Sequence, residues 1–404
     1  MKKSNLLYWI ACILFLYGCS SSNENVQNTA RGTLISQMEK GSYPKDQIKL
    51  AFSFLSASAA QSITPLYDIK LYKVLYYTTD ANGKAVQASG LVAVPQNVTK
   101  ALPLVSFHHG TVLRKTDVPS QLGTGFQIGL AFGTEGYIVA MPDFLGLGES
   151  PVLHPYMHAK TEATACVDML RATQALCKQL NISWNNQLFL MGYSQGGHVT
   201  LAVHKEIEEK HRTEFNITAS APMAAPTDLS GLQMDSLIAG RPYVAPSYLP
   251  YVMFALNPIY KMYPDLSAVL NPPYNTTLQP YFTVDMPFST SQLESILPPS
   301  KIPTDIMKAE ELQKIRSNRA THPTTLALKD NDVYDWKPSA PLKFYHCDAD
   351  RHVFYANAVK AKQSFEKNGS ATIDIINPLQ GGNHETCLVP SIIGAKDWFA
   401  TLKK

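Results

Sequence analysis

The chain has 404 residues, of which 45% are hydrophobic and 17% are charged, and this composition is typical of a globular protein with a large core. Its formal net charge is +3, and two of the positive charges, Lys2 and Lys3, lie at the N-terminus. A balance this close to neutral gives no electrostatic reason to expect nucleic acid or an acidic polymer as a partner.

The N-terminus has the parts of an export signal. A basic start precedes an unbroken apolar stretch at residues 6–17, which is too short for a bilayer because a spanning helix needs about 20 residues. The next residues, Gly18 and Cys19, complete a segment that resembles a bacterial lipobox, although Tyr17 replaces the small residue usual there. We therefore predict a signal peptide over residues 1–18 and acylation of Cys19. The alternative is a plain secretory signal with an incidental cysteine.

The polar segment that follows contains few bulky residues. It cannot bury enough apolar area to fold, and we expect residues 19–45 to form a flexible tether. An acyl anchor and a flexible spacer would hold a soluble domain at a membrane surface without spanning it. The sequence thus predicts an exported protein, lipid-anchored at Cys19 in a bacterial cell envelope, with its folded domain over residues 46–404.

Apolar runs alternate with helix-like segments along most of this domain. The first two runs are joined by a hairpin signal at residues 80–83. The later runs are continuously apolar, as in strands that are buried on both faces. This alternation predicts an α/β fold with a mostly parallel central sheet and helices on both faces. The expected strands are 67–79, 86–95, 102–107, 137–141, 188–191, 217–221, 342–346 and 371–376; the expected helices are 123–136, 161–180, 198–210, 353–367 and 392–403.

Residues 234–336 break this rhythm. The stretch 243–282 is rich in tyrosine and proline, and its only charged residues are Lys261 and Asp265. Because the prolines interrupt every apolar run, the stretch is no transmembrane span. We expect residues 234–336 to form an inserted cap over the carboxyl ends of the strands, with a helix at 306–315. The alternative is a long irregular surface excursion.

Residues 192–197 read Gly-Tyr-Ser-Gln-Gly-Gly and lie between an expected strand and an expected helix. A turn this tight brings backbone and side chains together, so Gly192 and Gly196 would occupy places where a Cβ clashes. The serine at the apex, Ser194, would be exposed, slightly strained and close to the positive end of the helix. We predict that Ser194 is a nucleophile; the alternative is a glycine-rich surface turn.

A serine hydroxyl needs an adjacent base, and that base must itself be oriented. In a sheet of this type the partners follow later strands, in the order serine, acid, histidine. His384 lies in a glycine-rich loop after the last expected strand and is the predicted base. Asp350 follows the strand before it and is the predicted acid, with Asp348 as the alternative.

Two backbone N–H groups should stabilise a developing oxyanion. We expect one from Gln195, directly after the nucleophile, and the other from Thr111, in the loop after the strand 102–107. His108 and His109 are expected to fix that loop by hydrogen bonds, without direct catalysis.

Taken together, these segments resemble an α/β-hydrolase and are most similar to bacterial lipoprotein relatives of the secretory lipase family. The similarity covers roughly residues 67–404, and the cap is its least recognisable part. In similar enzymes the Asp-x-x-Val spacing occurs at the acid, which favours Asp350 over Asp348. The resemblance implies ester hydrolysis through an acyl-enzyme, with no metal or organic cofactor. The segments that carry it are 192–197, His109-Gly110, the stretch 142–148, Asp350 and His384.

Four cysteines follow Cys19. If Asp350 contacts His384, then Cys347 and Cys387 lie on neighbouring loops and could form a disulfide in an exported protein. The other two, Cys166 and Cys177, are about 16 Å apart on one expected helix and too far from each other to bridge.

The sequence therefore predicts a membrane-tethered serine carboxylesterase or lipase that acts on a small-molecule or lipid ester. The aromatic cap predicts an apolar slot for an acyl or aryl group. One alternative is a serine peptidase of the same fold, although the cap has no obvious acidic cluster to bind a free amino terminus. Another is a surface-binding lipoprotein without activity, which the presence of all three triad side chains argues against.

Overall fold

The computed structural model describes residues 29–55, 60–370 and 373–404. Nine strands form one sheet in the order β1-β2-β3-β5-β4-β6-β7-β8-β9. The strands are β1 (Leu34–Tyr43), β2 (Ile69–Thr79), β3 (Ala85–Pro95), β4 (Leu102–His108), β5 (Ile138–Pro142), β6 (Trp184–Tyr193), β7 (Ile217–Met223), β8 (Leu342–Tyr345) and β9 (Ile373–Ile376).

The sheet has an antiparallel part and a parallel part. Strands β1, β2 and β3 pair antiparallel, as do β3 and β5. From β5 through β4, β6, β7, β8 and β9 every pairing is parallel. Strands β4 and β5 are buried along their whole length, which explains their continuous apolar runs. The mostly parallel sheet predicted from the sequence is confirmed.

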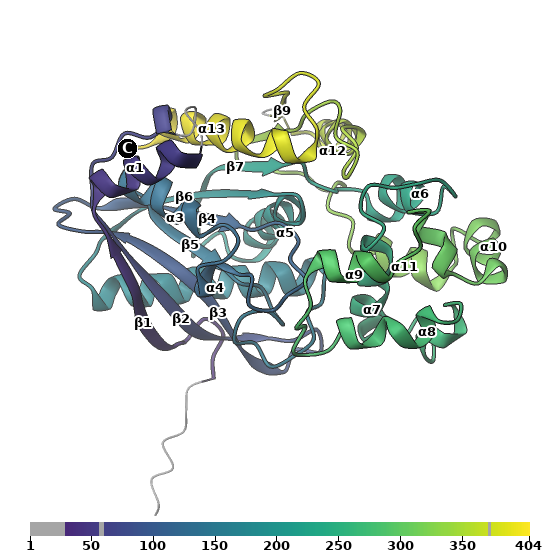
Figure 1. The fold of residues 1–404 in the computed structure, drawn as a ribbon. Coiled ribbons are helices and arrows are strands. Elements are labelled where there is room, and N and C mark those ends of the chain that lie inside the picture. The colour runs from purple at the N-terminus through teal and green to yellow at the C-terminus, as the bar shows by residue number, and fades with distance from the viewer. Residues whose placement is uncertain (1–28, 56–59, 371–372) are drawn as a thin grey trace, which may run out of the picture.

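Helices cover both faces of the sheet (Figure 1). Residues of α4 (Ala159–Gln179), α5 (Gln195–Lys210) and α12 (Ala356–Lys367) share one buried apolar cluster. Residues of α1 (Lys45–Leu55), α3 (Phe126–Thr134) and α13 (His384–Leu402) belong to a second cluster on the other face. The two clusters sandwich the sheet, as the alternation of strands and helices predicts.

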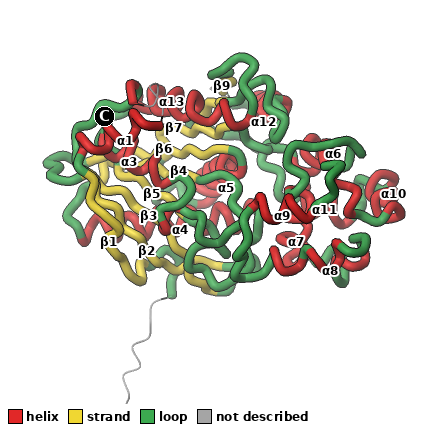
Figure 2. The backbone as a smooth tube through the Cα atoms, in the orientation of Figure 1, coloured by secondary structure: helices red, strands yellow, loops and turns green. Residues whose placement is uncertain are grey.

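Residues 234–336, between β7 and β8, contribute no strand to the sheet and are called here the helical segment (Figure 2). Aromatic rings pack together in this segment. Tyr243 contacts Tyr248, and Tyr251 contacts both Phe282 and Tyr156, which lies outside the segment. The expected helix at 306–315 is displaced to α10. The helices of the segment are α6 (Met234–Leu237), α7 (Tyr248–Tyr260), α8 (Tyr274–Thr277), α9 (Thr290–Ile296), α10 (Ala309–Ser317) and α11 (Pro323–Lys329).

The structure differs from the expected tether at its C-terminal end. Residues 34–43 form β1, which pairs with β2 from Leu34 opposite Tyr76 to Tyr43 opposite Ile69. None of the side chains of this edge strand is fully buried, and half of them are exposed, so its sequence lacks the apolar pattern of a buried strand. The expected signal peptide, Cys19 and the first part of the tether lie outside the described residues. Within the described ranges, no helix has both the length and the apolar character needed to cross a bilayer.

Candidate active site

The turn between β6 and α5 is as tight as the sequence predicts. Ser194 lies between the strand and the helix with φ 60° and ψ −121°, a conformation that L-residues rarely adopt and that strains the backbone. Contrary to the expectation of an exposed serine, Ser194 is buried, with 6% of its surface exposed. A Cβ added at Gly196 would lie 2.0 Å from the carbonyl oxygen of His108, and one at Gly192 would lie 2.3 Å from the carbonyl oxygen of Gly196. Only glycine fits at these two positions.

Three side chains that are far apart in the sequence meet at this turn. The Ser194 Oγ lies 3.0 Å from Nε2 of His384. On the other side of the ring, Nδ1 of His384 lies 2.6 Å from Oδ2 of Asp350. If Nδ1–H donates to the carboxylate, Nε2 is free to accept the serine proton. The arrangement is that of a nucleophile, a base and an orienting acid.

The carboxylate of Asp350 is buried and well supplied with donors. Its Oδ1 accepts the backbone N–H groups of His352 and Val353, at 2.8 and 2.9 Å. Burial alone would raise the pKa of Asp350, but hydrogen bonds from His346 and His384 lower it below its ordinary value, so the group is ionised at neutral pH. The alternative acid, Asp348, is exposed and accepts the backbone N–H of Gly381. The geometry brings Asp350 to the histidine.

A disulfide joins the loop that carries the acid to the helix that carries the base. Cys347 and Cys387 are bonded, with their Cα atoms 5.9 Å apart. Cys347 lies three residues before Asp350, and Cys387 lies three residues after His384 in α13. Cys166 and Cys177 are buried free thiols. The structure thus contains the cross-link that the sequence left open.

The residue after the serine is held by a buried polar network that sequence reasoning missed. The Gln195 amide nitrogen lies 3.0 Å from Oε1 of Glu162 and 3.3 Å from Nε2 of His154. The other carboxylate oxygen of Glu162 lies 2.8 Å from Nδ1 of His198. Burial alone would raise the pKa of Glu162 and lower that of His198, but their opposite charges outweigh burial and reverse both shifts. A buried ion pair therefore fixes the Gln195 side chain beneath the turn.

The loop after β4 is fixed as expected. Both ring nitrogens of His108 have hydroxyl partners, Ser106 at 3.0 Å and Thr200 at 2.8 Å, and burial lowers the pKa of His108 to about 3. The ring of His109 contacts the backbone carbonyls of Gly110 and Asp143. These contacts suit a structural role for both histidines.

Thr111, the expected second oxyanion donor, lies beyond these histidines in the same loop. Its Oγ1 is 2.9 Å from the hydroxyl of Tyr156. The preceding residue is Gly110, and a Cβ placed on it would lie 3.7 Å from Cβ of Ser194. This loop therefore passes close to the serine.

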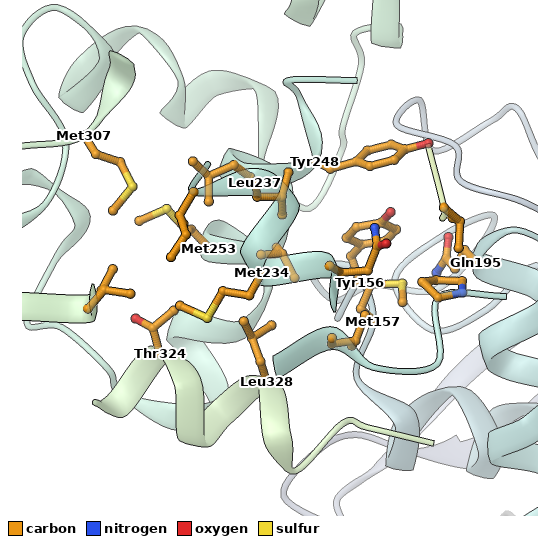
Figure 3. Close-up of a pocket in the computed structure, with 18 of the residues that line it drawn as sticks. Tyr156, Met157, Gln195, Met234, Leu237, Tyr248, Met253, Met307, Thr324 and Leu328 are labelled. Atoms are coloured by element: carbon orange, nitrogen blue, oxygen red, sulfur yellow. The ribbon is translucent and has the colours of Figure 1, made fainter. Parts of the chain in front are cut away.

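Ser194 lines an apolar cavity. The cavity extends into the helical segment (Figure 3). Tyr156, Met157 and Gln195 line one end, and Met307 and Thr324 line the other (Figure 3). The walls between them come from α6, α7 and α11 and include Met234, Leu237, Met253 and Leu328. Within residues 29–55, 60–370 and 373–404, no group of three or more His, Cys, Asp or Glu side chains could hold a metal ion.

Comparison with known proteins identifies the family. The secretory lipase family matches residues 127–400 of the chain, which is more than half of its length. The chain belongs to the secretory lipase family. No curated protein matches this secretory lipase.

Solved structures agree with this assignment. A Legionella pneumophila protein, provisionally called a hydrolase, is 28% identical with a TM-score of 0.82, over 91% of this chain and 98% of that one. The rice cell wall degrading esterase LipA from Xanthomonas oryzae is 26% identical with a TM-score of 0.81, over 91% and 98% of the two chains. Candida antarctica lipase A in its closed state, 20% identical over 93% and 84% with a TM-score of 0.66, shares the fold. This secretory lipase is an ester-cleaving hydrolase with the α/β-hydrolase fold, as the sequence predicts.

Proposed function

We propose that this secretory lipase cleaves carboxylic esters through an acyl-enzyme on Ser194, with His384 as the base and Asp350 as the orienting acid. The observation that carries the proposal is the continuous contact from the serine Oγ through both ring nitrogens to the carboxylate, at 3.0 and 2.6 Å. An ionised, buried Asp350 stabilises the imidazolium that forms when His384 takes the serine proton.

The reaction proceeds in two steps. The Ser194 oxygen bonds to the ester carbonyl carbon while His384 takes the serine proton. The backbone N–H groups of Gln195 and Thr111 hold the resulting oxyanion. His384 then protonates the leaving alcohol, which leaves an acyl-serine. A water molecule, deprotonated by the same histidine, releases the carboxylic acid and restores the serine.

The acyl group occupies the apolar cavity, with residues 234–336 acting as a cap. This assignment is supported by the cavity walls, which are almost wholly aliphatic, aromatic or thioether from Tyr156 to Met307. Such a lining would solvate a hydrocarbon chain and offer few partners to a charged or strongly polar one. The buried ion pair of Glu162 and His198 lies beneath Gln195 and is satisfied internally.

We further propose that the protein is a lipoprotein, held at a membrane in the cell envelope by an acylated Cys19. The lipobox-like segment and the preceding apolar stretch support this proposal. Membership of a family of secretory lipases supports export. Because Arg31 donates to Asp168 and Gly32 to Tyr77 before β1 begins at Leu34, the tether would be shorter than expected, and residues 20–30 would reach at most about 40 Å when fully extended.

The proposed activity is tested with p-nitrophenyl esters of increasing chain length beside aminoacyl anilides. We expect turnover of the esters with a preference for longer chains, negligible turnover of the anilides, and loss of ester turnover in Ser194→Ala. A preference for the anilides would favour a peptidase. Parental ester turnover in Ser194→Ala would exclude Ser194 as the nucleophile.

A further inference from the structure

A second histidine lies against the predicted base. The rings of His352 and His384 are stacked, with centroids 4.7 Å apart and planes inclined by 7°. On the far edge of its own ring, Nε2 of His352 lies 3.0 Å from Oε1 of Glu385, the residue after the predicted base. The backbone N–H of His352 donates to Asp350 at 2.8 Å. One residue therefore contacts both partners of the nucleophile.

The same residue also contacts the cap. The hydroxyl of Tyr243 donates to the backbone carbonyl of His352, and the hydroxyl of Tyr248 lies 3.4 Å from its Nδ1. Tyr248 belongs to α7 and lines the apolar cavity. His352 is thus a link between the cavity wall and the triad, and the mechanism described above does not use it.

The charge state of His352 suits a stacking role. The groups that face it are His384, Glu385, Asp350, Tyr243 and Tyr248. Burial and the charge of His384 lower the pKa of His352, and the two carboxylates oppose this shift only in part. The ring is therefore neutral at neutral pH, with Nε2–H donating to Glu385 and Nδ1 accepting from Tyr248. A neutral His352 ring carries no positive charge that would repel the protonated ring of His384 during the reaction.

The tilt of the buried His384 ring depends on the rings that pack against it as well as on its hydrogen bonds. Its two hydrogen bonds lie at opposite edges of the ring. Among the described residues, the ring of Tyr193 also packs against it, with centroids 5.0 Å apart and planes inclined by 51°. A tilted neighbour restrains a ring plane less than a parallel one. The contact with His352 is the flatter of the two, with planes inclined by 7°.

We propose that His352 is a positioning residue that holds the ring of His384 in its productive plane and connects this plane to the cap. The inference rests on the proposed function, because it requires His384 to be the base. It assigns the effect to the flat ring of His352 and not to its hydrogen-bonding nitrogens.

Three substitutions separate the ring from its nitrogens. His352→Ala removes both, His352→Phe keeps a flat ring, and His352→Gln keeps hydrogen-bonding groups without a ring. The hydrogen bond to Asp350 comes from the backbone of residue 352, so it survives in all three variants. Ser194→Ala serves as the control for the proposed function, and the thermal unfolding midpoint of each variant reports its folding.

We expect His352→Ala and His352→Gln to lower kcat for a p-nitrophenyl ester by about 10-fold or more, with KM within about twofold, because small misplacements of a catalytic group reduce the rate strongly. His352→Phe should recover most of the parental kcat. Parental kcat in His352→Ala, or an equal loss in the Ala and Phe variants, would overturn the inference. Such a result beside an inactive Ser194→Ala would leave the proposed function standing, whereas an active Ser194→Ala would contradict the proposed function itself.

Discussion

At the scale of single residues, only one of two neighbouring carboxylates reaches the imidazole of His384. Asp350 and Asp348 are two residues apart in the same loop, yet only Asp350 is buried against the ring. Asp348 accepts a backbone N–H at the surface of the loop that carries His384. The two side chains offer a matched pair of substitutions.

We predict that Asp350→Asn lowers kcat by about 10³–10⁴-fold, because an amide stabilises neither the required tautomer nor the imidazolium. Asp348→Asn should retain activity within about threefold, since it removes a surface hydrogen bond. Steady-state hydrolysis of a p-nitrophenyl ester measures both. A larger loss of kcat in Asp348→Asn than in Asp350→Asn would show that Asp348, and not Asp350, is the orienting acid.

The meeting of Ser194, Asp350 and His384 could be predicted from the sequence because each of them follows a strand whose apolar run is visible. The support around it could not. Glu162 lies on α4, and it meets Gln195 and His198 of α5 only because these two helices pack together. His352 likewise needs the fold to bring α13 beside its loop. No local motif marks such long-range meetings.

At the scale of elements, helix α11 forms part of the cavity wall with one face. Leu328 is buried and lines the cavity, whereas Leu326 on the same helix is 49% exposed. A bulky ring at position 328 would project into the space assigned to the acyl chain. The same ring at position 326 would project into solvent.

We expect Leu328→Trp to lower kcat/KM for a long-chain p-nitrophenyl ester by about 10–100-fold, since a blocked apolar pocket forfeits the burial of several methylene groups. Hydrolysis of the acetate ester should change by less than about threefold, which also shows that the variant folds. Leu326→Trp is the control and should match the parent on both esters. If Leu328→Trp lowered kcat/KM equally for both esters, the acyl chain would not occupy the cavity beside Leu328.

Some helices and strands could be predicted from the sequence and others could not. The hairpin between β2 and β3 was predicted, and Gly83 adopts φ 81° at its turn. Strand β1 was missed because an exposed edge strand carries no apolar alternation. The helices of the helical segment were expected only as a block, because short helices interrupted by proline have no sustained period.

At the scale of the whole molecule, Glu208 joins α5 to the stretch that leads from the helical segment into β8. Its carboxylate accepts the backbone N–H groups of Ser339 and Ala340 and lies 3.0 Å from Nε2 of His204. Burial raises the pKa of Glu208, but the His204 hydrogen bond and charge and these backbone donors outweigh burial and lower it to about 2. The contact therefore stabilises the fold in its ionised form.

Because the pKa in the folded protein lies below the ordinary value of 4.5, this stabilisation is present above about pH 4.5 and is lost as the pH falls toward 2. We predict that Glu208→Gln lowers the free energy of unfolding by about 1–3 kcal/mol near neutral pH, and by less at about pH 3. Urea unfolding at both pH values measures the difference, with the exposed Glu209→Gln as the control. A cost that stays the same at both pH values would contradict the assigned role of the charge.

The account depends most directly on a covalent intermediate at Ser194. Mass spectrometry of the protein after treatment with a fluorophosphonate tests this, because the reagent forms a stable bond with an activated serine. We expect a single adduct, mapped to the peptide that contains Ser194, and no adduct in Ser194→Ala, which should also have lost ester hydrolysis. An adduct at a different residue, or unchanged hydrolysis in Ser194→Ala, would contradict the account.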